Sequence, residues 1–98
     1  MVWKKGDVIC FTEDVIMTAF LDFYVEAGEP CVVLKCNNSH VTVMPLSHTD
    51  VSYEVFLKSK SKHLKSFAKL GGHTLRNSKT KRKIIRFKPD SKLTKILF

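Results

Sequence analysis

The strongest structural signal in the sequence is a pair of strand-forming runs joined by a short connection. Residues 31–36 (CVVLKC) are rich in β-branched and apolar side chains, and residues 40–44 (HVTVM) alternate between polar and apolar types. The Asn-Asn-Ser connection at 37–39 consists of residues that tolerate tight turns. We therefore predict a β-hairpin that ends at Pro45.

Short apolar runs on both sides of this hairpin predict further strands. These strands are expected at residues 8–12, 22–25, 51–57 and 84–87. Three segments fit more than one structure. Residues 15–21 suit a helical turn or a loop, residues 73–79 a loop or a short strand, and residues 92–98 a frayed helix or a last strand.

After Ser59 the apolar spacing changes to that of a helix. One helical face carries Leu64, Phe67, Ala68 and Leu70. Lysines and serines surround this face, so we predict a short, basic, amphipathic helix over residues 60–70. Ser59 or Ser61 is expected to cap its start, and Gly71-Gly72 to end it in a left-handed conformation.

Length and composition restrict how these elements combine. The chain has 98 residues, of which 44% are hydrophobic, and this suits one domain over 1–98 with a modest core. Several short strands, one hairpin and one short helix predict a mainly β, α+β fold. We expect a small, strongly bent antiparallel sheet or barrel.

Charge divides the chain near residue 51. Residues 1–50 form an acidic, β-rich part with three lysines and seven acidic residues, which gives a net charge of −4. Residues 51–98 form a basic part with fourteen Lys and Arg and two acidic residues, which gives a net charge of +12. Clustered cations attract anions, and nucleic acid rewards each phosphate contact through counterion release.

The basic part therefore predicts a regulatory, non-enzymatic module that binds DNA or RNA through its phosphates. The candidate contacts are Lys58, Lys60, Lys62, Lys65, Arg76, Lys79, Lys81, Arg82, Lys83, Arg86 and Lys88. Tyr53 and Phe87 are candidates for stacking on unpaired bases. Two alternatives stay open: a merely solvated cationic face, and an adaptor or inhibitor that docks on an acidic surface of the transcription, translation or replication machinery.

Cysteine usage and the N-terminal sequence predict a cytoplasmic protein, or one of the host cytoplasm if a phage encodes it. The three cysteines form no disulfide framework, and the chain shows no signal peptide. No apolar run approaches the ~20 residues of a membrane helix, so no membrane partner is expected.

No metal or cofactor is expected from the sequence. Cys31 and Cys36 are five residues apart on one predicted strand, which places them on opposite faces and disfavours a zinc site. Gly71-Gly72 lacks the Lys-Ser/Thr that follows the glycine of a nucleotide-binding loop.

Part of the acidic half resembles a known class of small barrels. Lys5-Gly6-Asp7-Val8, residues 27–34 (AGEPCVVL) and residues 41–47 (VTVMPLS) carry the likeness. This pattern resembles Src-homology-3-like barrels of the KOW and Tudor type, which open with a Gly-Asp-hydrophobic strand and have a glycine before the next strand. The resemblance implies such a barrel, with nucleic acid or other proteins as partners.

The same residues are similar to the first half of MazF/PemK-type toxins, which are endoribonucleases on a related barrel. Pro30 and Pro45-Leu46-Ser47 match that family's pattern. Glu29 stands where the family has its catalytic arginine. The resemblance implies a ribonuclease in which Arg76 or Arg86 replaces that arginine.

Under the ribonuclease interpretation, Ser47 and His48 are the residues to test, with Asp50 close behind. Neighbours along a strand or turn rarely point at one another, and catalytic triads are usually assembled from distant segments. We therefore predict no catalytic residue.

Overall fold

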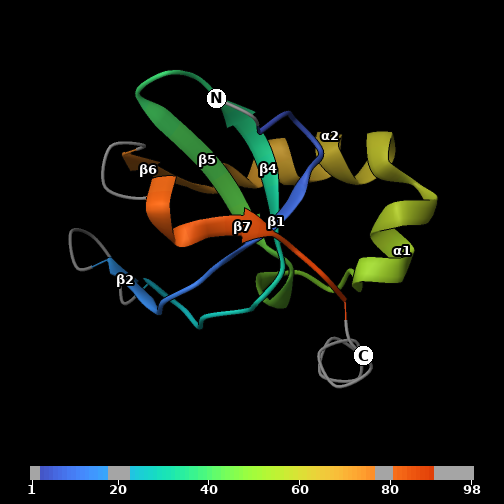
Figure 1. Ribbon diagram of the computed structural model, residues 1–98. Coiled ribbons are helices and arrows are strands. Elements are labelled where there is room, and N and C mark those ends of the chain that lie inside the picture. Colours follow the sequence, from blue (N-terminus) through green and yellow to red (C-terminus); the bar gives the residue numbers. More distant parts are fainter. Residues whose placement is uncertain (1–2, 18–22, 77–80, 90–98) are drawn as a thin grey trace.

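The computed structural model describes residues 3–17, 23–76 and 81–89. At its centre is a five-stranded antiparallel sheet with the strand order β6-β5-β4-β1-β7 (Figure 1). The strands are β1 Val8–Phe11, β4 Cys31–Cys36, β5 His40–Pro45, β6 His73–Arg76 and β7 Ile84–Arg86. A separate two-stranded hairpin consists of β2 Val15–Met17 and β3 Phe23–Val25. The mainly β prediction is confirmed.

The predicted hairpin is β4 paired with β5. The register runs from Cys31 opposite Pro45 to Cys36 opposite Val41. The Asn37 side-chain oxygen accepts hydrogen bonds from the backbone N–H groups of Ser39 and His40, both at 2.8 Å. This side chain therefore closes the turn in the way that its sequence predicts.

The remaining strand predictions are confirmed except in two places. β1, β3 and β7 lie within the predicted strands, and β6 occupies the first part of residues 73–79. The front of residues 15–25 is a strand, β2, because it pairs with β3 rather than turning as a helix. Residues 92–98 lie outside the described part of the chain. Among the described strands, β6 and β7 are the edges of the sheet, and no pairing between them closes it into a barrel.

The second error is the strand predicted at 51–57. That segment contains the helix α1 Tyr53–Lys58. The Ser52 hydroxyl accepts a hydrogen bond from the backbone N–H of Val55 at 3.3 Å, which caps the helix N-terminus. Phe56 is fully buried, while Val55 is 43% exposed. The alternation that suggested a strand therefore does not follow the buried face.

The predicted helix over 60–70 is α2, which spans Lys60–Leu70. Ser59 is its N-cap residue but makes no capping hydrogen bond through its side chain. Gly71 ends the helix with φ of 93°, in the left-handed conformation. Phe67 is the buried anchor of the helix, at 2% exposure.

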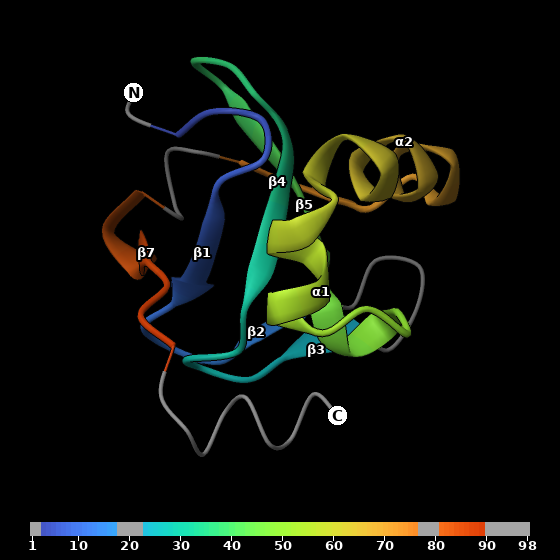
Figure 2. The same cartoon turned by 90° about the vertical axis from the view of Figure 1, so that its right-hand side faces the viewer.

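The central sheet is buried on both faces. The hairpin-side core contains Ile9, Phe11, Val25, Cys31, Val33, Val41, Val43, Leu75 and Ile84. The helix-side core contains Val32, Leu34, Met44, Leu46, Phe56 and Phe67. Figure 2 shows α1 and α2 together on one side of β4 and β5. Burial on both faces explains why the start of β4 is a continuous apolar run.

A β-bulge interrupts β4 at Leu34. Val33 pairs with Val43 and Lys35 pairs with Thr42, so Leu34 is an extra residue without a partner in β5. The extra residue reverses the alternation of side chains beyond it. Cys36 consequently packs against the same hairpin-side core as Cys31, and the prediction of opposite faces is wrong.

The contact between the end of α2 and the sheet yields a stability prediction. A Cβ atom on Gly72 would lie 2.8 Å from the Val43 carbonyl oxygen and 2.7 Å from Leu34 Cδ1, whereas a Cβ on Gly71 meets nothing within 4 Å. Both glycines have positive φ. Gly71→Ala is expected to cost about 1–2 kcal/mol from backbone strain. Gly72→Ala should cost about 1–3 kcal/mol more from overpacking.

Urea unfolding of the two variants measures this difference. Equal losses of unfolding free energy would show that α2 does not press its terminus against β4 and β5.

Candidate nucleic-acid interface

The helices carry four of the predicted nucleic-acid contacts. Lys58 ends α1, and Lys60, Lys62 and Lys65 lie on α2; all four are exposed. With 3.6 residues per turn, Lys62, Lys65 and Lys69 fall on the side of α2 opposite the buried Phe67. We call these three residues the lysine stripe. Lys69 belongs to it although the sequence-based site did not include it.

No acidic residue lies in α2, and Glu54 at the start of α1 is the one carboxylate of both helices. Within the described ranges, the ion pairs found use Lys83 and Arg86 and leave the stripe out. The positive charge of α2 therefore faces solvent without a carboxylate partner in this part of the structure.

The cations around β7 are in a different setting. The Lys83 ammonium lies 3.1 Å from the Glu13 carboxylate. The Arg86 guanidinium lies 3.4 Å from the Asp7 carboxylate and 5.2 Å from the centre of the Trp3 ring. Exposed pairs of this kind contribute about 0–1 kcal/mol each. They nevertheless place a negative charge beside each of these two cations.

The structure thus divides the predicted site. Arg82 precedes β7 and Lys88 follows it, and both are exposed. Figure 2 shows β7 and the two helices on opposite sides of β4 and β5. Arg76 is exposed on the far edge strand β6, opposite His40. Lys79 lies outside the described residues, and the backbone of Lys81 begins the 3-10 turn η2 Lys81–Lys83.

The two aromatic residues proposed for base stacking pack against each other. Phe87 is 8% exposed, and its ring centre lies 5.0 Å from that of Tyr53 in an edge-on arrangement. This contact joins the end of β7 to α1. Phe87 therefore serves the core rather than a base.

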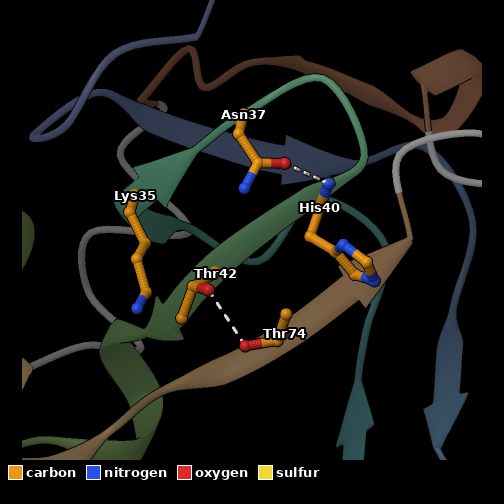
Figure 3. Close-up of a pocket in the computed structure, with 5 residues that line it drawn as sticks. All are labelled: Lys35, Asn37, His40, Thr42 and Thr74. Carbon is orange, nitrogen blue, oxygen red and sulfur yellow. Dashed lines mark hydrogen bonds between the residues drawn. The ribbon is translucent and has the colours of Figure 1, made fainter.

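A polar depression lies on the helix-side face of the sheet, where β4, β5 and β6 run side by side. It has a volume of about 290 Å³ and is lined by Lys35, Asn37, His40, Thr42 and Thr74 (Figure 3). The Thr42 and Thr74 hydroxyl oxygens are 2.9 Å apart. No carboxylate of the described residues belongs to this lining.

The depression was missed because its residues come from both halves of the chain. Lys35 lies on the helix-side face only because of the bulge at Leu34, and the sequence of β4 does not predict this bulge. Thr42 and Thr74 are direct neighbours across β5 and β6, although 32 residues separate them in the chain. In the sequence, polar His40 and Thr42 alternate with apolar Val41 and Val43, and this alternation indicates a partly polar face.

A second polar cluster contains Glu29, His48 and His73. His48 ends the 3-10 turn η1 Leu46–His48, and its ring lies edge-on to that of His73 with centres 5.7 Å apart. Burial raises the pKa of Glu29, partly offset by a hydrogen bond from the Glu26 backbone N–H and by the nearby His48. Burial also lowers the pKa of His73, helped by His48.

The position of Glu29 in this cluster differs from what the resemblance to MazF/PemK-type toxins implies. Glu29, which replaces the expected arginine, is a half-buried carboxylate beside His48. Ser47 and Asp50 are both exposed. A phosphate group approaching this cluster would meet a carboxylate where the resemblance expects an arginine.

The described residues hold no group of three or more His, Cys, Asp or Glu side chains placed to bind a metal ion. Burial raises the pKa of the Cys10 and Cys31 thiols, which keeps them protonated and unreactive.

No helix in the described part of the chain is long and apolar enough to span a membrane. No protein-family model, curated protein or solved structure matches this chain.

The pKa shift of Glu29 predicts a pH-dependent stability effect. Because the folded-state pKa is raised, ionised Glu29 opposes folding, and this cost appears as pH rises through the folded-state pKa. Glu29→Gln should therefore raise the melting temperature at pH 7, and the gain should shrink at pH values below the unfolded-state pKa of the carboxyl.

Thermal unfolding of Glu29→Gln, with the exposed Asp50→Asn as the charge-matched control, checks this effect. If Glu29→Gln raises the melting temperature equally at pH 7 and at a pH below the unfolded-state pKa of the carboxyl, burial of the carboxylate is not the cause of the increase.

Proposed function

We propose that the protein binds nucleic acid and that the lysine stripe on α2 is its principal contact. The observation that carries this proposal is the geometry of one helix. Phe67 anchors α2 to the helix-side core, so Lys62, Lys65 and Lys69 must face solvent on a rigid element without a carboxylate among them. A cationic row fixed in this way suits a polyanion.

The length of the stripe supports a phosphate backbone as the ligand. From Lys62 to Lys69 the helix rises about 10 Å at 1.5 Å per residue. Successive phosphates of one strand advance about 3.4 Å along the axis of a duplex, so a row aligned with that axis spans roughly three phosphate steps. Lysine ammonium groups act as point charges, and they contact phosphates without reading bases. The proposed binding is therefore electrostatic, with limited sequence preference.

A protein partner with an acidic face is the second candidate function. Leu70 is 66% exposed beside Lys69, and Leu57 is 44% exposed beside Lys58. Apolar side chains next to cations suit a mixed protein surface better than a phosphate backbone. A pull-down from nuclease-treated lysate tests this candidate. The barrel and the cytoplasmic location expected from the sequence stay predictions, and the ribonuclease stays an alternative.

Fluorescence anisotropy with labelled single- and double-stranded DNA and RNA, at two or more salt concentrations, tests nucleic-acid binding. Wild-type protein should bind with an affinity that falls steeply as salt rises. The double variant Lys62→Gln/Lys65→Gln should lower the slope of log affinity against log salt by about 2, since each lost phosphate contact removes about 1.

Lys4→Gln/Lys5→Gln is the matched control, because it removes the same charge from two exposed lysines at the other end of the chain. Equal slopes for the two double variants would contradict a role for α2. Absence of binding by wild-type protein at low salt would reject the proposed function.

A further inference from the structure

We propose that the depression formed by Lys35, Asn37, His40, Thr42 and Thr74 is a binding site for a phosphate group. The site is built by β4, β5 and β6 and does not depend on the lysine stripe. The phosphate can belong to a nucleic-acid strand, in which case this inference deepens the proposed function, or to a free phosphorylated molecule such as a nucleotide. The chemistry that recognises it is the same in both cases.

The sign of the charge around the depression favours an anion. Lys35 enters the site because the bulge at Leu34 turns it to this face. Arg76 is paired with His40 across β5 and β6 and so lies on the same face, one position beyond the lining. Among the described residues, no carboxylate lines the site to hold a metal cation or oppose a phosphate.

The hydroxyl pair supplies a neutral donor at the floor of the site. Thr42 is only 3% exposed, and its hydroxyl oxygen lies 2.9 Å from that of Thr74. A hydrogen bond between the two hydroxyl groups uses one of their two hydrogens. The second hydrogen is left to donate to an acceptor that enters the depression, as phosphate oxygens can. Figure 3 shows this pair between Lys35 and His40.

A chain of hydrogen bonds fixes the side chains of the turn. The Ser39 hydroxyl lies 3.0 Å from the Asn37 side-chain oxygen and 2.8 Å from His40 Nδ1. Because the Ser39 hydroxyl donates to Asn37, the His40 Nδ1–H donates to Ser39, and this contact fixes the orientation of the ring. In Figure 3 the Asn37 amide nitrogen is turned away from His40, on the side of Lys35.

Phosphate fits this set of groups better than other small ligands. Its oxygens only accept hydrogen bonds when it is fully ionised, and the site offers the Lys35 ammonium group and a threonine hydroxyl hydrogen. A depression of about 290 Å³ also accommodates part of the sugar attached to the phosphate.

Titration of ¹⁵N-labelled protein with inorganic phosphate, AMP, adenosine and a short oligonucleotide tests the site. Phosphate and AMP should shift the backbone amide signals of residues 35–42 and 74–76, and adenosine should not. Lys35→Ala should weaken AMP binding about tenfold or more, the usual loss for a charged hydrogen bond. Lys5→Ala, which removes the same charge from an exposed lysine outside both proposed sites, should leave AMP binding unchanged.

Thr74→Val is the second variant. Thr74 is exposed in a strand, and valine is a good strand residue, so the fold should persist, as thermal unfolding would verify. This variant should also weaken AMP binding. The site is overturned if neither phosphate nor AMP shifts these amides, or if Lys35→Ala and Lys5→Ala bind AMP equally.

The same titrations identify the source of the phosphate. If it belongs to a strand, Lys35→Ala and Lys62→Gln/Lys65→Gln should both weaken oligonucleotide binding. If it belongs to a free nucleotide, AMP should bind more tightly than the oligonucleotide, and the stripe variant should bind AMP normally. Binding of AMP without any oligonucleotide binding would support this site and reject the proposed function.

Discussion

The structure depends on one constraint, which is that the central strands β4 and β5 are buried on both faces. Four of the six residues of β4 are buried at its start, and their side chains alternate between the two cores. Neither face can be left to water, because exposing a buried valine or leucine costs about 1.5–3 kcal/mol. The β2–β3 hairpin covers one face of the sheet, and α1 and α2 cover the other.

The helix side shows how this constraint leads to the proposed interface. Phe56 of α1 and Phe67 of α2 pack nearly parallel, with ring centres 6.1 Å apart, over Val32 and Met44. Once Phe67 is held in this position, the remaining faces of α2 are fixed as well. The lysines of the stripe point away from the sheet because they lie on the side of α2 opposite its buried face. Apolar packing thus arranges the cations, which contribute little to the packing themselves.

Some elements of the fold follow from local sequence patterns, and others depend on contacts with distant parts of the chain. The helix α2 and the β4–β5 hairpin follow from residue spacing and turn chemistry within one segment, and both were predicted. The helix α1 was missed because Val51, Tyr53, Val55 and Leu57 alternate like a strand. Its conformation is decided instead by the burial of Phe56 and the cap from Ser52. A local pattern cannot show which of its apolar residues the rest of the fold will cover.

The candidate site was predictable in charge but not in arrangement. The sequence identified a basic half, but the chain order does not reveal that β7 pairs with β1, which places Arg86 beside Asp7. Nor does it reveal the bulge that brings Lys35 to the face of Thr42 and Thr74. Both features depend on long-range pairing, so the cations divide between two sides of the sheet where the sequence suggested a single basic surface.

We propose that nucleic acid contacts the helix side of the sheet, and a paramagnetic probe on the nucleic acid can locate this contact. A spin-labelled single-stranded oligonucleotide added to ¹⁵N-labelled protein broadens the amide signals nearest to it. Broadening is expected at residues 62–69, with weaker effects at 35–42 and little effect at 84–88. Broadening that is concentrated at 84–88, or at Glu29 and His48, would contradict it.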